Sequence, residues 1–224
     1  NQDYGQAALP TQNVATNQAA PAIPDTPLGN NASASADVPS ANGETSAPLE
    51  TPVVTNKDLI HVKTDVLELA IDPQGGDIAQ LKLPLYPRRQ DHPDVPFQLF
   101  DNGGERTYLA QSGLTGTNGP DARATGRPVY STEQKTYQLA DGQNQLNVDL
   151  KFSLDGVNYI KRFSFTRGLY DLKVTYLIDN TSDKAWSGNL FAQLKRDASS
   201  DPSSSTATGT ATYLGAALWT SNEP

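Results

Sequence analysis

The chain of 224 residues contains no cysteine and no methionine, and it has only two histidines. The lack of cysteine excludes a disulfide framework, a thiolate metal site and a cysteine nucleophile. The lack of methionine leads us to expect a longer or processed polypeptide, with any signal or anchor upstream of Asn1. No part of the sequence approaches the roughly 18 consecutive apolar residues that a membrane-spanning helix needs.

Apolar residues and positive charges are both scarce. Hydrophobic residues make up 36% of the chain, and counting glycine in place of tyrosine raises the share only to about 40%, below the ~45–50% of an average globular domain. We therefore expect part of the chain to be solvated. With 17 basic and 25 acidic residues the net charge is -8, so the chain as a whole is repelled by nucleic acids and anionic lipid headgroups.

Lysine and arginine are absent from residues 1–56, which hold five acidic residues and seven prolines. Such a segment buries too little apolar surface to offset about 1–2 kcal/mol of backbone entropy per residue. We therefore predict a disordered linker over residues 1–56, and a folded part over residues 57–224 that forms the N-terminal part of a larger domain.

The folded part has apolar residues at every second position, which is the spacing of half-buried β-strands. The clearest run covers residues 146–152. Asp155-Gly156 follows and predicts a hairpin, because glycine tolerates the positive φ of a tight primed turn. Tyr159, Phe163 and Phe165 alternate along its second strand. Other predicted strands cover residues 60–63, 67–71, 79–83, 97–100, 107–111, 136–139, 172–178 and 185–195.

No window of helical period competes with these strands, and long Gly- and Pro-rich connections separate them. The pattern predicts an all-β fold, an antiparallel β-sandwich. The chain stops at residues 222–224 without a closing element, so we expect the sheets to continue beyond Pro224.

Few residues stand in a pattern that supports catalysis. His61 and His92 lack partners at metal-ligand spacing. Asp72 and Asp77 flank a Pro-Gln-Gly-Gly turn, and we interpret them as turn residues rather than as paired catalytic carboxylates. Ser112 lacks the Gly-x-Ser-x-Gly pattern of a hydrolase nucleophile. We predict no catalytic residue, no metal site and no cofactor.

Aromatic side chains are the most ambiguous group, because flat rings line sugar and peptide grooves as well as protein cores. The candidates for a ligand or partner cleft are Trp186, Trp219, Tyr159 and Tyr176. Core or edge positions are the alternative for each of them. Addition of a partner strand to a sheet edge is another mode of binding open to such a domain.

Several short blocks resemble, in order and spacing, the periplasmic domain of the YidC family of membrane protein insertases. They are LIHVKTDVL at 59–67, GGDI at 75–78, LPLYP at 83–87, FQL at 97–99, AQSGLTG at 110–116, GPD at 119–121, RPVY at 127–130 and QLK at 193–195. The ordered series is far more specific than any single block. The polar segment before Lys57 also resembles the variable linker of Gram-negative members.

The resemblance implies a β-supersandwich similar to galactose mutarotase folds, in the periplasm, on a protein of the Gram-negative inner membrane. That protein is expected to insert and help fold integral membrane proteins, alone or with the Sec translocon. The helices that carry the family's insertion groove and its membrane anchor are absent from this chain, so the implied role is a non-catalytic accessory domain. The implied partners are the Sec translocon with its ancillary subunits and nascent integral membrane proteins, and not nucleic acid.

Two other functions stay open. A carbohydrate-binding or sugar-processing protein built on the same sandwich would show a response of Trp186 or Trp219 to added sugars. A domain that serves mainly as a spacer would be dispensable for membrane protein insertion.

Overall fold

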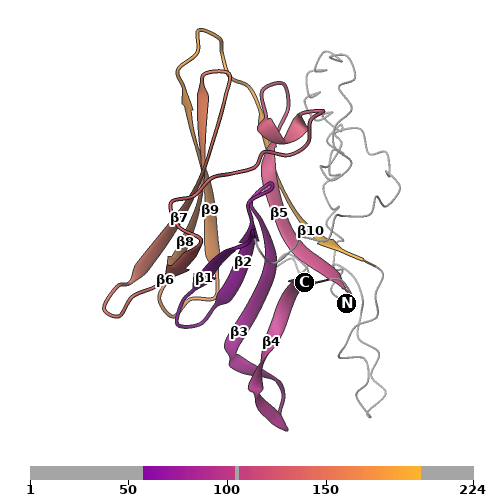
Figure 1. Ribbon diagram of the computed structural model, residues 1–224, viewed down its shortest axis with the longest axis vertical. Coiled ribbons are helices and arrows are strands. Elements are labelled where there is room, and N and C mark those ends of the chain that lie inside the picture. The colour runs from indigo at the N-terminus through magenta and orange to yellow at the C-terminus, as the bar shows by residue number, and fades with distance from the viewer. Residues whose placement is uncertain (1–57, 104–105, 198–224) are drawn as a thin grey trace, which may run out of the picture. The chain divides into compact units, whose positions relative to one another are not determined.

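The computed structural model describes residues 58–103 and 106–197, which form two β-sheets that share one core (Figure 1). The predicted linker over residues 1–56 and Trp219 lie outside the described residues. The strands are β1 (Ile60–Lys63), β2 (Glu68–Asp72), β3 (Asp77–Arg89), β4 (His92–Asn102), β5 (Thr107–Thr115), β6 (Thr136–Gln138), β7 (Gln145–Leu154), β8 (Val157–Thr166), β9 (Leu172–Asn180) and β10 (Asn189–Arg196). A single 3-10 turn, η1 (Pro120–Ala122), interrupts them, and nothing in these two ranges is helical over a length that would reach across a bilayer.

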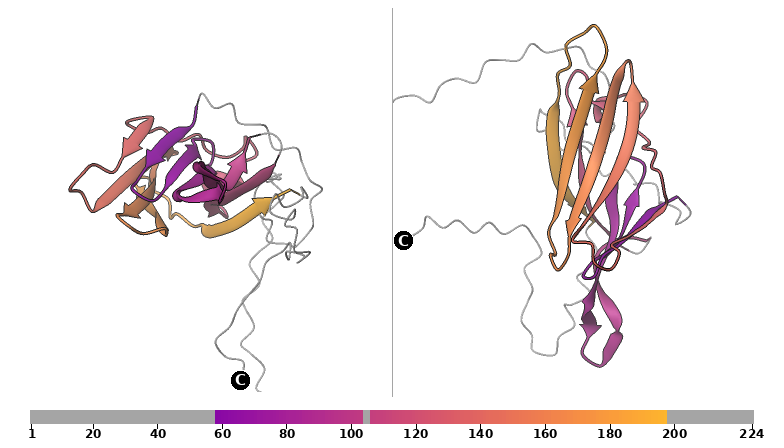
Figure 2. Two further views of the ribbon diagram at one scale, coloured as in Figure 1. Left: turned by 90° about the horizontal axis from the view of Figure 1, so that it is seen from below. Right: turned by 90° about the vertical axis from the view of Figure 1, so that its left-hand side faces the viewer.

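The larger sheet has the strand order β10-β5-β4-β3-β2-β1-β6, and the smaller sheet has the order β7-β8-β9 (Figure 2). The predicted all-β sandwich is confirmed. All but one of the strand pairings in the described residues are antiparallel, and the exception is the parallel pair β1–β6. The alternation of apolar and polar residues could not predict that this pair is parallel, because side chains alternate in the same way in parallel and antiparallel strands.

The inner faces of the two sheets supply one shared apolar core. Its fully buried members include Ile60, Val62, Leu69 and Ile71 from the larger sheet and Val148, Leu150, Phe163 and Phe165 from the smaller one. Along β8 every second residue is buried, as the period of two predicts. Ala70 lies between the core residues Leu69 and Ile71 and is buried in a separate small cluster with Leu59 and Ala79.

The hairpin of β7 and β8 has the predicted tight turn. Leu154 pairs with Val157, so only Asp155 and Gly156 form the loop. Both have positive φ, 50° and 78°. This is the backbone of a type I′ turn, whose twist matches that of the flanking strands.

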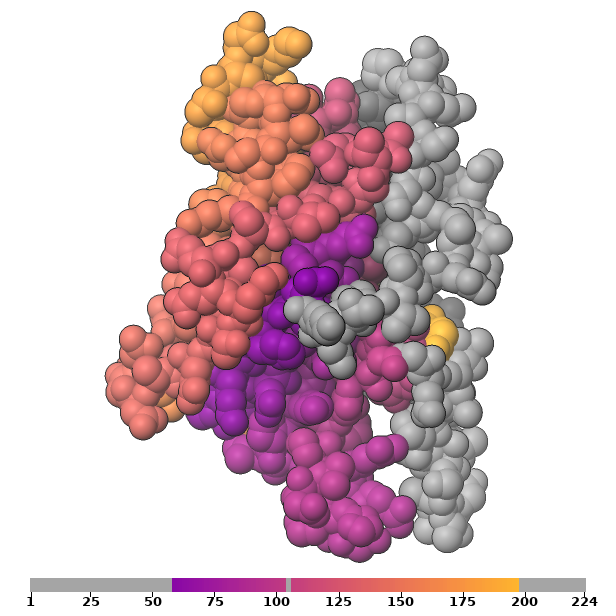
Figure 3. Space-filling view, viewed as in Figure 1, coloured from indigo at the N-terminus to yellow at the C-terminus, as the bar shows by residue number. Residues whose placement is uncertain are grey.

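The hairpin of β3 and β4 is longer than the sequence predicts. The predicted strands cover residues 79–83 and 97–100, but β3 runs to Arg89 and β4 starts at His92, and the hairpin projects from the body of the domain (Figures 1 and 3). Its prolines, which argued against strands, are Pro84, Pro87, Pro93 and Pro96. The pairing shifts register on both sides of Pro87, and such irregularities let proline stay within a β-ribbon.

Candidate functional site

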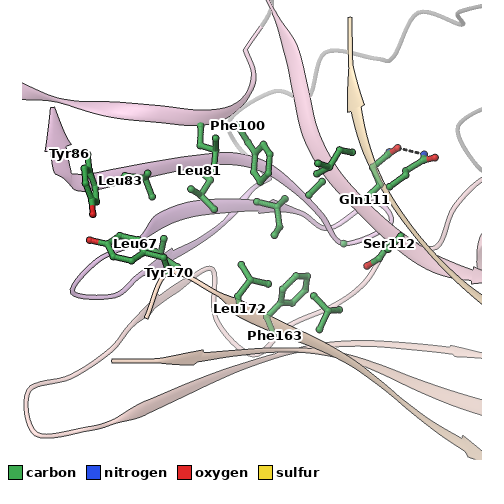
Figure 4. A pocket seen from close by; sticks show the side chains of 18 residues that line it. Leu67, Leu81, Leu83, Tyr86, Phe100, Gln111, Ser112, Phe163, Tyr170 and Leu172 are labelled. Atoms are coloured by element: carbon green, nitrogen blue, oxygen red, sulfur yellow. Dashed lines mark hydrogen bonds between the residues drawn. The ribbon is translucent and has the colours of Figure 1, made fainter. Parts of the chain in front are cut away.

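An apolar groove of about 760 Å³ lies between the two sheets (Figure 4). Its walls are aliphatic and aromatic side chains of both sheets, among them Leu81, Leu83, Leu99 and Phe100 on one side and Phe163, Leu172 and Val174 on the other. No lining residue carries a formal charge. The groove therefore suits an uncharged, apolar occupant.

The two ends of the groove differ in polarity. At one end the rings of Tyr86 and Tyr170 meet edge to face, with 5.6 Å between their centroids. At the other end the amide of Gln193 donates to Oε1 of Gln111 at 2.7 Å. Ser112 lies beside Gln111 in β5 and joins the hydroxyl of Tyr176 at 3.1 Å. The groove thus combines an apolar channel with a small set of polar groups at one end (Figure 4).

A buried ionic cluster lies next to the polar end of the groove, and Arg127 is its centre. The guanidinium donates to Oδ1 of Asp121 at 2.8 Å and to Oδ2 of Asp77. Its Nη2 also donates to the backbone carbonyls of Gly75 and Ser112 at 3.2 and 3.0 Å. The side chain of Arg127 therefore joins the loop after η1 to the β2–β3 turn and to β5.

Lys161 belongs to the same cluster but comes from the smaller sheet. It lies on the apolar side of β8 and is completely buried. Its Nζ donates to the carbonyls of Gly75 and Ser112 at 3.0 and 2.8 Å. Lys161 thus connects the two sheets through the same backbone carbonyls that Arg127 holds.

Burial and the neighbouring opposite charges shift the pKa values of this cluster in opposite directions. Burial lowers the pKa of Lys161 to about 8, although the nearby Asp77 opposes the shift. Burial raises the pKa of Asp77, against the attraction of Arg127 and Lys161. Burial alone would lower the pKa of Arg127, but Asp77 and Asp121 raise it, so the guanidinium stays charged. The four side chains together carry two positive and two negative charges, a balanced arrangement for groups removed from water.

Glycine is required where the cluster meets the strands. A Cβ on Gly113 would lie 2.5 Å from the carboxylate carbon of Asp121 and from the ring of Phe191. The same Asp121 carboxylate accepts a hydrogen bond from the backbone amide of Leu114 at 2.8 Å. Gly113 thus allows η1 to approach β5 closely.

The blocks that resemble a known family meet at this cluster. Gly75 and Asp77 belong to the block at 75–78, Gln111 and Ser112 to the block at 110–116, and Arg127 to the block at 127–130. They lie far apart in the sequence and converge only in the fold. The cluster therefore explains in structural terms why these blocks occur together.

Lys161 was not among the residues predicted for a site, although its position in the strand gave a signal. Tyr159, Phe163 and Phe165 define the buried side of β8, and Lys161 falls on the same period of two. A lone lysine on the core side of a strand needs buried acceptors and a charge partner. Asp72 and Asp77 were both interpreted as turn residues. Asp72 does lie in the turn, where its Oδ1 accepts a hydrogen bond from the backbone amide of Gln74 at 2.8 Å. Asp77 instead belongs to the buried ionic cluster.

The four aromatic candidates do not line the groove as a set. Tyr159 is buried, and its hydroxyl accepts a bond from Nε1 of Trp186 at 2.9 Å and donates to the carbonyl of Asn118. Tyr176 is half-buried in the same apolar cluster and faces Ser112. The structure thus brings three of them together, while Trp219 is outside the described residues. The ligand cleft predicted for them stays a prediction.

Neither histidine stands in a catalytic or metal-binding arrangement. His61 is exposed on β1, and His92 is exposed near the tip of the β3–β4 hairpin, where it faces Asp91 at 3.8 Å. In the part of the chain that the structure describes, no three His, Asp or Glu side chains are grouped so that they could hold a metal ion.

Comparison with known proteins gives a consistent result. Residues 59–224 match the family model of the YidC periplasmic domain. Over the whole chain, 98% of residues are identical to a protein of Pseudomonas fluorescens strain SBW25 named membrane protein insertase YidC. Proteins with the same name from Pseudomonas syringae pv. tomato strain DC3000 and Pseudomonas putida strain GB-1 are 78% and 77% identical, also over the whole chain. The chain spans 40% of the length of each of these relatives.

Proposed function

Because this chain belongs to the YidC family of membrane protein insertases and matches its periplasmic domain, we propose that it is a non-catalytic interaction domain of such an insertase. The insertase acts in the inner membrane of a Gram-negative bacterium, and this domain faces the periplasm. Its partners are nascent integral membrane proteins and the Sec translocon with its ancillary subunits. Segments outside this chain anchor it to the membrane.

The observation that carries the proposal is the apolar groove between the sheets. It is large, free of charge and bounded by β9 and β10, the edge strands of the two sheets. A cavity with apolar walls and a few polar groups is the usual form of a binding site for an apolar ligand or segment. Membrane proteins in transit expose long uncharged segments, and these match the chemistry of the groove.

The arrangement of the ionisable groups supports a role without catalysis. The four buried charges of the described part, Arg127, Lys161, Asp77 and Asp121, bind one another or backbone groups, and of their side-chain atoms only Oδ1 of Asp77 is buried without a hydrogen-bond partner. A catalytic group must instead present a polar atom to the substrate. The cluster instead holds two residues that line the groove: Gln111 donates to Asp77, and the carbonyl of Ser112 accepts bonds from Arg127 and Lys161.

A pull-down tests this function. The purified chain is immobilised and exposed to detergent-solubilised inner membranes of Pseudomonas fluorescens, and the bound proteins are identified. We expect Sec subunits or newly made membrane proteins. Leu194→Asp, which places a charge at the groove, should reduce their recovery, whereas Leu177→Asp, on an exposed leucine away from the groove, should not. Recovery of neither class by the unmodified chain would refute the proposal.

A further inference from the structure

The exposed apolar side chains of the described residues are concentrated at one end of the domain. Six of the ten large ones lie on the β3–β4 hairpin or on the neighbouring turn between β8 and β9. These six, which we call the hairpin patch, are Leu85, Tyr86, Val95, Phe97, Leu169 and Tyr170. The contact between the rings of Tyr86 and Tyr170 joins the two segments into one surface (Figure 4).

The chemistry of the hairpin patch is that of a protein surface at a lipid–water boundary. Tyrosine is enriched at membrane interfaces because its ring is apolar and its hydroxyl is polar. Leucine, valine and phenylalanine bury apolar surface just below the headgroups. Leu85 is 64% exposed, so the described residues around it leave most of its side chain open to solvent.

Charge at the tip of the hairpin differs from charge in the rest of the chain. The chain has a net charge of -8, of which residues 1–56 contribute -5, whereas residues 84–97 contain two arginines and two aspartates and are therefore neutral. Arg89 pairs with Asp91 at 3.1 Å, whereas Arg88 forms no ion pair in the described residues. Arg88 is thus available for a lipid phosphate.

The prolines favour a lipid surface over a partner strand. An extended polypeptide that adds to a sheet edge needs a row of backbone N–H donors and C=O acceptors. The hairpin has prolines at 84, 87, 93 and 96, which lack the N–H group, and its register is irregular. It is therefore suited to binding through its side chains rather than through its backbone.

We propose that the hairpin patch contacts the surface of the lipid bilayer, with Leu85 inserted below the headgroups and Arg88 bound to lipid phosphate. This proposal rests on the proposed function in one respect, which is that the domain lies beside a membrane. The contact orients the domain with its β3–β4 end toward the bilayer. The groove opens next to Tyr86 and Tyr170, so its apolar end would then face the membrane from which client segments enter or leave.

Fluorescence of a single labelled cysteine tests the contact, and the absence of native cysteine makes the labelling specific. Leu85→Cys carries an environment-sensitive fluorophore, and the matched control is Val129→Cys, which is 65% exposed and lies outside the patch. Vesicles of phosphatidylethanolamine and phosphatidylglycerol are added to each. We expect a several-fold rise in emission at position 85, quenching by lipids brominated in the acyl chain, and no response at position 129.

Two further variants of the labelled protein separate the roles of charge and apolar insertion. Arg88→Glu should weaken vesicle binding about tenfold, and omission of phosphatidylglycerol should have a similar effect. Phe97→Asp, at an exposed position of the patch, should abolish the response at position 85. Equal responses at positions 85 and 129, or no response at either, would overturn the proposal. A response that requires a Sec subunit in the vesicles would overturn it too. In each of these cases the pull-down result for the proposed function stands unaffected.

Discussion

At the scale of single residues, a few buried charges hold the two sheets in place. Arg127 and Lys161 come from different parts of the chain and share the carbonyls of Gly75 and Ser112. Asp77 and Asp121 balance their charges. Such a set contributes little net stability as a whole, but it is costly to leave incomplete.

Loss of Arg127 should therefore be much more damaging than loss of an exposed ion pair. Arg127→Gln leaves Asp77 and Asp121 buried with only Lys161 to compensate, so we expect the free energy of unfolding to fall by about 3–5 kcal/mol. Arg162→Gln removes the ion pair with Asp149, in which both side chains are partly exposed, and should cost much less. Urea unfolding of both variants makes the comparison. Similar losses in the two would show that the buried cluster has no special role.

Lys161 should give the domain an unusual pH dependence. Its pKa is about 8 in the folded chain and its ordinary value is 10.5, so between these values the unfolded chain holds a proton that the folded chain has released. The free energy of unfolding therefore rises with pH in this window. Relative to Lys161→Met, which keeps Asp77, Asp121, Arg127 and Tyr176 unchanged, the unmodified chain should gain on the order of 1–3 kcal/mol between pH 8 and 10.5. Urea unfolding across this range measures it, and a constant or falling difference would contradict it.

At the scale of elements, alternation predicted most strands, and tertiary contacts decided the rest. The β7–β8 hairpin could be predicted because its turn, its two strands and its buried side are all encoded locally. The extension of β3 and β4 could not, because four prolines argue against strands and only the irregular register accommodates them. The cluster around Arg127 could not be located either, because its members meet through pairings between distant segments.

Substitution of the turn glycine Gly156 tests whether side-chain crowding at the β7–β8 turn affects stability. Gly156 has φ 78° and a Cβ there would lie 3.2 Å from Cβ of Ser182, whereas Gly142 has φ 80° and open space around it. Gly142→Ala should therefore cost only the left-handed backbone penalty, about 1–2 kcal/mol. Gly156→Ala should cost about 1 kcal/mol more, because Ser182 must shift. Thermal or urea unfolding of the two variants measures the difference, and equal losses would show that crowding at this turn is unimportant.

At the scale of the whole molecule, the domain combines a firmly connected interior with apolar surfaces left open. The ionic cluster binds Gln111 and Ser112 at one end of the groove, and at the other end Tyr86 of the β3–β4 hairpin meets Tyr170 (Figure 4). Under the proposed function, these surfaces bind apolar segments of membrane proteins in transit. The account therefore assigns the domain a role through contact and not through chemistry.

Photo-crosslinking in living cells tests that central claim most directly. A photoreactive amino acid replaces, one at a time, the ten exposed large apolar residues of the described part in the full-length Pseudomonas fluorescens relative. We expect crosslinks from at least one of the ten positions to membrane proteins under synthesis or to Sec subunits. These crosslinks should disappear when translation is stopped. Crosslinks to neither from any of the ten positions, in cells whose insertase is active, would contradict it.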